Sequence, residues 1–424
     1  MIDWVFSGSI EERFPNTTGG IEIAESTAAL ALGSLFRRKP RDFINLFFNN
    51  DNRREKEHYK NLPITINRLT IPGGPSNYGR KNEQPFLQTS QYESLFARMV
   101  VPKILNNISK SKTKLVHLTS NMSASAVLGD SAFKLFRENH ATLCTYSAYN
   151  SLTLFKEPTF WFDSSKLARR EWQIRKNAED FSIEKSDIII APSRYVKRLV
   201  YSLGRRKAKE IVVIPPTTMP FPWIPGDVLE ERWKSKIVLY MGRLAKEKNV
   251  DILITSLKKV FKCAPEAKVV ICGEGPERDN LLRICKEQKL RIRFSEPFVN
   301  GAIHFIGVVA SKKKERIFKR AMINVCLSSF EGSPVIACEA LAAALPSIVT
   351  NIPPWQERVT NNKEGLLVKI NSNDVETGLS SILSNKDLFI KMSNQAYNTY
   401  KKNYLPELIA RSRISLYKKI GCKI

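Results

Sequence analysis

The feature that most constrains the fold is a repeated alternation of short apolar runs with helical patterns. Runs such as "DIIIA", "IVLYM" and "KVVIC" are rich in branched aliphatic residues and end at polar or glycine-containing turns. Several are followed by apolar residues at helical spacing, as in "VDILITSLKKVFK" and "ERDNLLRICKEQ". Continuous apolar strands joined by helices are typical of parallel sheets covered on both faces. The sequence therefore predicts an α/β protein with doubly wound, Rossmann-like sheets.

The length of the chain and one change in composition predict two domains. A chain of 424 residues exceeds the usual size of one domain. Residues 215–227, "PPTTMPFPWIPGD", are rich in proline, which cannot donate to a sheet and favours a linker. We expect two Rossmann-like domains that face a cleft, with a last helix packing back toward the first. The expected boundaries are 1–218 for the first domain, 219–228 for a proline-rich hinge, 229–405 for the second domain and 406–424 for the helix.

Charge and cysteine content narrow the class of protein. The 67 Lys and Arg residues exceed the 41 Asp and Glu residues, giving a net charge of +26 that is spread over both domains. Such an excess favours an anionic partner: nucleic acid, a membrane surface or a phosphorylated substrate. Seven cysteines without a C-x-x-C pair indicate reduced thiols. No signal peptide and no apolar run of ~18 residues are recognisable, so a cytoplasmic protein is expected.

The stretch "SSFEGSPVIACEALA" places two glutamates around a predicted helix start. Ser333 suits the N-cap and Pro334 the first helical position, just after an apolar strand. The N-terminus of a helix attracts phosphate through its free N–H groups and its dipole. Glu331 would precede the cap and Glu339 would lie about five residues into the helix. The two carboxylates could accept hydroxyls on either side of a diphosphate, although an isolated glutamate is more often a surface charge.

Two other strand–turn–helix segments support a phosphate site. "YMGRLAKEKNVDIL" places Arg243 and Lys248 after a strand, at the sheet edge where ligands of doubly wound domains bind. "VVICGEGPERDNL" has glycines that would let the backbone approach a base or ribose closely. The alternative for the first segment is a solvated basic loop. As a loop cation on a wet wall, Lys248 is expected to contribute little to folding stability.

Taken together, these motifs resemble those of the retaining glycosyltransferases of family 4, which have the GT-B fold. The family pattern has a "GR-L-x-x-x-K" loop, a "G-x-G-P" turn, and two glutamates, in "E-G" and "E-A", with seven residues between them. This sequence matches it with "GRLAKEK", "GEGP" and "EGSPVIACEA". The resemblance covers the C-terminal half densely and the N-terminal half thinly. It implies an N-terminal acceptor domain and a C-terminal nucleotide-sugar domain.

The resemblance also implies roles for individual residues. Arg243 and Lys248 would hold the donor's pyrophosphate, and Glu331 would contact the hydroxyls of the donor sugar; these three are the implied catalytic residues. The implied donor-binding residues are Glu339 on the ribose, the turn at Gly273 and Glu274, the amides near Ser333, Pro334 and Val335, and the loop at Gly19 and Gly20. No metal and no cofactor are expected, because fixed cations and amides can stabilise the leaving group. The donor would be a UDP- or GDP-linked hexose.

The implied activity is transfer of a hexose-type sugar to a hydroxyl with retention, in polysaccharide, lipopolysaccharide or other glycan assembly. Many relatives act on lipid-linked acceptors. The basic clusters at 37–41, 205–209 and 312–314 are therefore either solvated helix ends and loops or a surface that binds the inner face of an anionic membrane. Leu35 and Phe36 would then dip into the headgroups. The alternatives are a GT-B enzyme with a soluble sugar or protein acceptor, or a nucleic-acid-binding protein without catalysis. His117 and His304 are interpreted as core residues.

Overall fold

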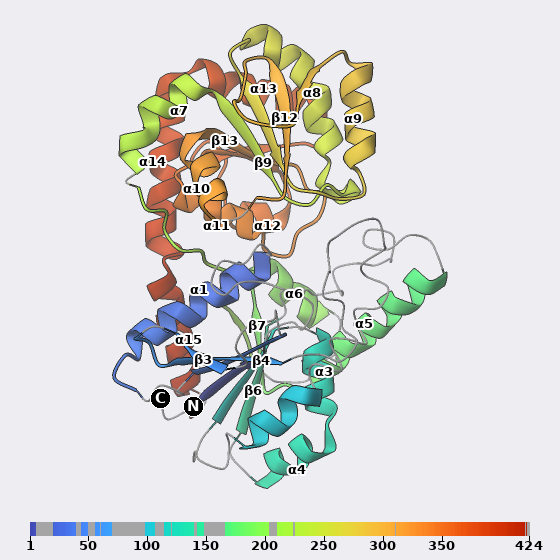
Figure 1. The fold of residues 1–424 in the computed structure, drawn as a ribbon, viewed down its shortest axis with the longest axis vertical. Helices are drawn as coiled ribbons and strands as arrows, with labels where there is room; N and C mark the ends of the chain where they lie inside the picture. The colour runs from blue at the N-terminus through green and yellow to red at the C-terminus, as the bar shows by residue number, and fades with distance from the viewer. Residues whose placement is uncertain are drawn as a thin grey trace. The chain divides into compact units, whose positions relative to one another are not determined.

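The computed structural model describes residues 1–5, 20–39, 44–49, 56–59, 61–69, 98–106, 114–119, 121–139, 142–147, 166–202, 210–223, 225–309, 311–419 and 421. The chain divides into two compact units, each built on its own sheet (Figure 1). Unit 1 comprises Met1–Pro15, Glu25–Pro215 and Pro406–Ile424, and unit 2 comprises Asn16–Ala24 and Pro216–Leu405. The predicted α/β class is confirmed, because both sheets are largely parallel and alternate with helices.

Unit 1 contains an eight-stranded sheet in the order β3-β4-β2-β1-β5-β6-β7-β8. β3 pairs antiparallel with β4, and the other pairs are parallel. The strands are β1 (Ile2–Val5), β2 (Ile44–Asn49), β3 (Lys56–His58), β4 (Ile64–Leu69), β5 (Lys114–Leu118), β6 (Thr142–Ser147), β7 (Ile188–Ala191) and β8 (Ile211–Val213). The described helices are α1 (Gly20–Leu35), α3 (Asn121–Gly129), α4 (Ser131–Asn139), α5 (Lys166–Lys185), α6 (Arg194–Ser202) and α15 (Pro406–Lys419), together with residues 98–106.

Helices cover both faces of this sheet. One hydrophobic cluster joins β5 and β7 to residues 98–106 and to α3, α5 and α6. A second cluster joins the opposite face to α1 and α15. Neighbouring residues of a strand point to opposite faces, so Ile188 and Ile190 belong to one cluster and Ile189 to the other. The last helix of the chain is thus part of the core of unit 1.

A buried polar cluster adds a second attachment for α15. Arg413 of this helix donates from Nη2 to Oε1 of Glu25 in α1 at 2.7 Å, and His117 of β5 lies 3.2 Å from both partners. All three side chains are at most 1% exposed. Burial lowers the pKa of His117, so its imidazole is neutral at pH 7. The prediction that His117 is a core residue is confirmed, but no sequence pattern indicated its charged neighbours.

Unit 2 contains a seven-stranded sheet, parallel throughout, in the order β11-β12-β10-β9-β13-β14-β15. Its strands are β9 (Ile237–Met241), β10 (Lys268–Cys272), β11 (Arg291–Arg293), β12 (Ala302–Gly307), β13 (Ala321–Cys326), β14 (Ser347–Thr350) and β15 (Gly365–Val368). Its helices are α7 (Leu229–Ser235), α8 (Val250–Cys263), α9 (Arg278–Glu287), α10 (Ser311–Arg320), α11 (Val335–Ala342), α12 (Pro353–Gln356), α13 (Ser372–Ser384) and α14 (Lys386–Asn403), with short 3-10 turns η4 (Pro225–Val228) and η5 (Lys246–Lys248).

The central strand β9 shows how the two faces of this sheet are covered. Val238 and Tyr240 pack in a cluster with α8, α9 and α13, whereas Ile237 and Leu239 pack in a cluster with α10 and α11. Figure 1 shows these two groups of helices on opposite sides of the strands. Every strand has its carboxyl end at the same edge of the parallel sheet, and this edge is where we expect the predicted site.

The proline-rich segment packs on unit 2 through side chains. Thr217 donates from its hydroxyl to the carbonyl of Tyr404 at 2.5 Å, and the Tyr400 hydroxyl donates to the carbonyl of Thr218 at 2.7 Å. Phe221 stacks on Phe318 with ring centroids 5.0 Å apart. The segment therefore has fixed contacts within this unit. The end of the segment forms η4 and the residues after it form α7, neither of which sequence analysis predicted.

Arg232 of α7 joins the carboxyl ends of α10 and α11. Its fully buried guanidinium donates to the carbonyls of Phe318 and Lys319 at 3.0 and 2.9 Å, and to the carbonyl of Ala343 at 2.7 Å. Burial lowers the pKa of Arg232 to about 9, which still leaves the group charged at neutral pH. Carbonyls at helix ends carry partial negative charge and need donors, so one cation satisfies both helices.

Replacing this guanidinium should destabilise unit 2 specifically. In Arg232→Met the apolar stem remains while buried carbonyls lose their donors, and we expect the free energy of unfolding to fall by ~3 kcal/mol. Hydrogen exchange at the amides of β9 and β13, measured by mass spectrometry, would report this fall in the free energy of unfolding. Arg283→Met on α9 is the matched control, because this arginine is exposed, and should change the value by less than ~0.5 kcal/mol. Equal protection in both variants would contradict the assigned role of Arg232.

Candidate functional site in unit 2

The "GRLAKEK" loop follows β9 at the carboxyl edge of the sheet. The amide of Gly242 donates to the carbonyl of Cys272 at 3.0 Å, which continues the pairing of β9 with β10. The loop then forms η5 and reaches α8 through Asn249, whose φ of 49° lies in the left-handed region. Asparagine tolerates this conformation better than most residues. The side chains of Arg243 and Lys248 are thus carried by a short, defined connection.

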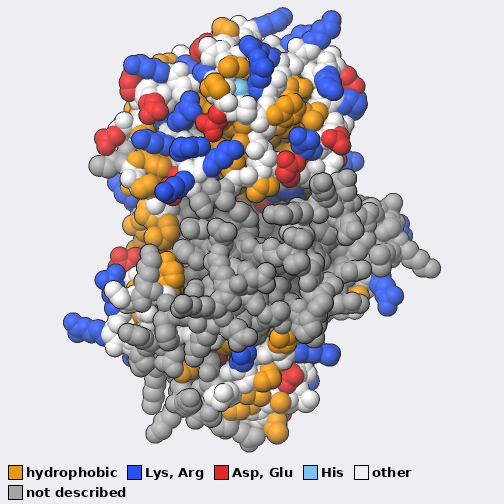
Figure 2. All heavy atoms as spheres, viewed as in Figure 1, with side chains coloured by type: hydrophobic (Ala, Val, Ile, Leu, Met, Phe, Trp, Pro, Cys, Tyr) orange, Lys and Arg blue, Asp and Glu red, His pale blue; other side chains and the backbone are white. Residues whose placement is uncertain are grey.

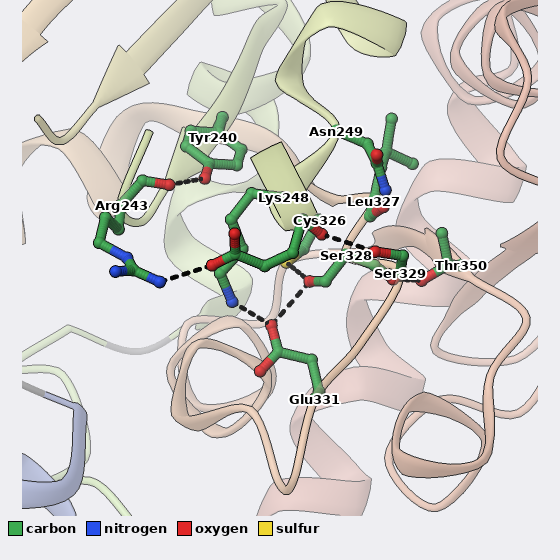
Figure 3. Close-up of polar contacts among 11 residues, drawn as sticks. Tyr240, Arg243, Lys248, Asn249, Cys326, Leu327, Ser328, Ser329, Glu331 and Thr350 are labelled. Atoms are coloured by element: carbon green, nitrogen blue, oxygen red, sulfur yellow. Dashed lines mark hydrogen bonds and ion pairs between the residues drawn. The ribbon is translucent and has the colours of Figure 1, made fainter. Parts of the chain in front are cut away.

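The loop after β13 lies directly beside it. The amide of Ser329 donates to the carbonyl of Glu247 at 2.9 Å, and the side-chain amide of Asn249 donates to the carbonyl of Leu327 at 2.7 Å. On the other side, the Thr350 hydroxyl donates to the carbonyl of Ser328 at 2.5 Å. These bonds fix the loops of three neighbouring strands against one another (Figure 3).

Lys248 and Glu331 meet where the two loops join. The Lys248 ammonium lies 2.6 Å from Oε1 of Glu331, and the Ser328 hydroxyl donates to the same oxygen at 2.7 Å (Figure 3). The two charged side chains are only 20% and 14% exposed. Burial lowers the pKa of Lys248, but the neighbouring Glu331 carboxylate outweighs this and the pKa lies above its usual value. The expectation that Lys248 is a wet-wall cation is therefore wrong.

Arg243 is held by a second carboxylate that sequence analysis missed. Its Nη2 lies 2.5 Å from Oε1 of Glu247, which is 3% exposed, and its carbonyl accepts from the Tyr240 hydroxyl at 2.7 Å. Burial raises the pKa of Tyr240 well above its usual value, so this hydroxyl remains a donor. The spacing of Arg243 and Glu247, four residues apart, was visible in the sequence as "RLAKE".

Glu339 lies in α11, as predicted, but it also has a cationic partner that sequence analysis missed. The carboxylate contacts the ammonium of Lys314 from α10, and these side chains are 8% and 16% exposed. Sequence analysis placed Lys314 in a surface cluster, because α10 was not predicted. Glu331 and Glu339 thus both have cationic partners and are largely buried, which excludes the interpretation of either as an ordinary solvated surface charge.

The predicted N-cap at Ser333 is wrong by one residue. α11 begins at Val335 with Pro334 as its N-cap in an extended conformation, and no side chain caps the helix. The Ser333 hydroxyl instead accepts from Nη2 of Arg358 at 2.5 Å. Arg358 is 4% exposed and also lies over the Tyr404 ring, so it holds the turn before the helix. A contact over 25 residues could not be recognised from spacing.

The glycines of "GEGP" make room for protein backbone. A Cβ on Gly273, whose φ is +143°, would lie 1.8 Å from the carbonyl oxygen of Gly242, and one on Gly275 would lie 2.3 Å from that of Leu244. The amide of Leu244 donates to the carbonyl of Glu274 between them at 2.9 Å. The observed close approach is therefore to the loop that carries Arg243. The Glu274 side chain is half exposed and pairs with Arg278.

Other expectations from the sequence concern Gly19 and Gly20, metal ligands, membrane spans and His304. Gly20 is the first residue of α1, and Gly19 lies outside the described residues. Within the described ranges, no group of three or more His, Cys, Asp or Glu residues could hold a metal ion. The helices that the structure describes include none long and apolar enough to cross a membrane. His304 is buried, accepts from the amide of Val299 and contacts the carbonyl of Ser295, which confirms it as a core residue.

Known proteins share this sequence pattern and this fold. Residues 227–401 match the family described as "Glycosyl transferases group 1". The chain is 27% identical over 184 residues to an uncharacterized glycosyltransferase of Methanocaldococcus jannaschii. That alignment covers 43% of this chain and 45% of the relative, so the chain spans about half of its length.

Two solved structures extend the likeness to nearly the whole chain. Sucrose-phosphate synthase from Thermosynechococcus elongatus superimposes with a TM-score of 0.75 at 18% identity, covering 99% of this chain and 98% of the other. Anabaena HepE, solved in complex with UDP and glucose, superimposes with a TM-score of 0.65 at 13% identity, covering 98% of this chain and 99% of the other. The chain has the GT-B fold, as predicted. The match to the glycosyl transferases group 1 is confined to residues 227–401, which lie in unit 2.

The packing of the glycine turn leads to a prediction for the site. Gly275→Ala would push a methyl group into the carbonyl of Leu244 and displace the loop that carries Arg243. We expect a lower melting temperature, because forcing a methyl group against packed backbone strains the native structure. Gly226→Ala is the matched control, since its Cβ would meet nothing within 4 Å. If both variants behave like the wild type, the turn does not position the loop.

Proposed function

We propose that this chain transfers a hexose-type sugar from a nucleoside diphosphate donor to an acceptor hydroxyl, with retention of configuration and without a metal ion. The observation that carries the proposal is the Lys248–Glu331 pair, which joins the "GRLAKEK" loop to the glutamate motif after β13. A cation for a phosphate and a carboxylate for sugar hydroxyls are thereby held within one hydrogen bond of each other. The HepE complexes with UDP and UDP-glucose support a uridine donor, and a GDP-linked donor is the alternative.

The roles follow from the charge of each group. The donor's diphosphate would accept hydrogen bonds from Arg243 and Lys248, and these cations would stabilise the charge that develops as the anomeric bond to phosphate breaks. Glu331 would accept hydrogen bonds from hydroxyls of the donor sugar, and Glu339 from those of the ribose. The turn at Gly273 and Glu274 and the amides near Ser333, Pro334 and Val335 would line the same site.

The cations are already paired with carboxylates, so binding would involve an exchange of partners. Arg243 lies within hydrogen-bond distance of Glu247, and Lys248 lies within hydrogen-bond distance of Glu331. A diphosphate would draw the two cations toward itself and leave the carboxylates available for hydroxyls. Such preorganised charges need little rearrangement during the reaction, which makes a metal ion unnecessary for stabilising the leaving group.

A hydrolysis assay with a Lys248 variant tests this proposal. One of UDP-, GDP- or ADP-hexose should be slowly hydrolysed by the purified protein in EDTA, and Lys248→Ala should reduce that rate by ~10²-fold or more. Lys246→Ala is the matched control, because this lysine lies in the same turn and is exposed. Full dependence on Mn²⁺ or Mg²⁺ would overturn the metal-free mechanism, and wild-type rates in Lys248→Ala would remove the assigned donor site.

A loss of folding must be separated from a loss of chemistry in that experiment. Lys248→Ala leaves the Glu331 carboxylate largely buried without its cation, which costs stability. The double variant Lys248→Met, Glu331→Gln removes both charges and should regain most of the melting temperature. Its donor hydrolysis should remain as low as that of the single variant. Recovery of activity together with stability would assign Lys248 a structural role only.

We also propose that the acceptor is lipid-linked and that the enzyme binds the cytoplasmic face of an anionic membrane. Arg37, Arg38 and Lys39 follow α1 in unit 1 and are exposed. Leu35 and Phe36 pack against the core of unit 1, so the proposed insertion of these two side chains is wrong and the attraction would be electrostatic. Figure 2 shows further Lys and Arg side chains spread over the visible surface of unit 2. The clusters at 205–209 and at Arg41 lie outside the described residues.

Sedimentation with vesicles tests the membrane proposal. The protein should sediment with vesicles rich in anionic lipid at low salt and be released by ~0.5 M NaCl, because salt screens exposed charges. Changing Arg37, Arg38 and Lys39 to Glu should weaken this binding while donor hydrolysis is unchanged. Charge reversal at Lys258, Lys259 and Lys262, which are exposed on α8, is the matched control and should retain more binding. If the wild type stays in the supernatant at low salt, a soluble sugar or protein acceptor replaces the lipid.

A further inference from the structure

One lysine of α10 is more buried than the other cations of that helix. α10 carries the sequence "SKKKERIFKR", and the side chains of Lys312, Lys313, Arg316 and Lys319 are exposed. Lys314 is only 16% exposed, and its ammonium contacts Oε1 of Glu339 in α11. Ile317 and Phe318 of the same helix are buried against the sheet, which fixes its rotation. Lys314 is therefore directed at the carboxylate, unlike its neighbours in the sequence.

The Glu339 carboxylate needs this cation. Its side chain is 8% exposed, and a buried carboxylate is stable in its charged form only when it is paired and hydrogen-bonded. An ionised carboxylate has about four lone-pair positions, so contact of Oε1 with one ammonium leaves acceptor capacity for other donors. The ion pair thus orients the Glu339 carboxylate while leaving it able to accept hydroxyls.

We infer that Lys314 is a positioning residue that lets the donor site recognise the ribose of the nucleotide. This inference rests on the proposed function, in which Glu339 accepts hydrogen bonds from ribose hydroxyls. Lys314 acts through Glu339, and a nucleotide lacking the relevant hydroxyl gains nothing from the pair. Lys314 also neutralises a carboxylate that would otherwise repel an approaching diphosphate.

The helix ends support a fixed geometry for this pair. Arg232 binds carbonyls at the carboxyl end of α10 and the carbonyl of Ala343 just beyond α11. The two helices that carry Lys314 and Glu339 are therefore joined by a third, buried side chain. A fixed ion pair loses less side-chain entropy on ligand binding than one that must form at that moment.

The experiment measures the preference for ribose in nucleoside diphosphate binding. UDP, GDP and ADP are titrated calorimetrically into the protein, and the nucleotide that binds is compared with its 2′-deoxy and 3′-deoxy analogues. The wild type should bind at least one analogue ~10-fold or more weakly, as expected for a lost hydrogen bond to a charged group. In Lys314→Met the ribonucleotide should bind ~10-fold more weakly, and its preference over the analogue should fall to about one. Lys314→Arg should retain most of the preference for the ribonucleotide.

Controls separate this role from general stability and from surface charge. Lys319→Met makes the same change at an exposed position of α10 and should keep the wild-type preference. If Lys314→Met is poorly folded, the double variant Lys314→Met, Glu339→Gln removes both charges and should fold while lacking the preference. A wild type that binds no nucleoside diphosphate would overturn the proposed function together with this inference. The inference alone would be overturned if Lys314→Met and the double variant both retained the ribose preference. Tighter binding of the ribonucleotide by Lys314→Met would also overturn it.

Discussion

The buried guanidinium of Arg232 is the interaction on which the geometry of unit 2 most depends. Helix carboxyl ends expose carbonyls that must find donors, and α10 and α11 both end beside this one side chain. Satisfying both ends at once fixes the separation of the two helices. Lys314 projects from one of them and Glu339 from the other, so the same constraint sets the distance across their ion pair. A charged group outside the site thus determines the geometry inside it.

A second constraint comes from the close contact of backbone with backbone at the carboxyl edge of the sheet. The turn at Gly273 and Gly275 leaves no space for side chains against Gly242 and Leu244. The loop after β9 is in turn bonded to the loop after β13 through the carbonyl of Glu247. Each loop is therefore defined by its neighbour, which restricts movement of the charged side chains they carry. This rigidity is what a site made of preorganised charges requires.

Sequence patterns predicted the strands and helices that have strong apolar periodicity. β9, α8, β10, α9, β13 and α11 were recognised because aliphatic runs and glycine turns mark them. Glu339 lies in α11, and Arg243, Lys248 and Glu331 lie in the loops that follow β9 and β13. α10 was missed because eight of its ten residues are polar or charged and only Ile317 and Phe318 face the core. β11 has three residues, too few for an alternating pattern.

The partners of the site residues could not be predicted, because pairing depends on distance in space. Lys314 is 25 residues from Glu339 and Arg358 is 25 from Ser333, while Arg413 is 388 from Glu25. No periodicity connects such positions. Ser333 and Pro334 satisfied the local rules for a helix start, yet the nearby guanidinium of Arg358 binds the hydroxyl that would have capped the helix. Tertiary contacts overrode a correct local preference.

These pairings also change how the net charge of +26 should be interpreted. Counting residues treats every cation as available to an anionic partner outside the protein. Arg232 and Arg413 are instead buried among carbonyls and a carboxylate, and Lys248 and Lys314 are paired inside the proposed donor site. The proposed attraction to a membrane would depend on exposed cations such as those following α1, whereas the internal cations would act on the fold or on the proposed donor. Counting charged residues therefore overestimates how many cations are available to a partner outside the protein.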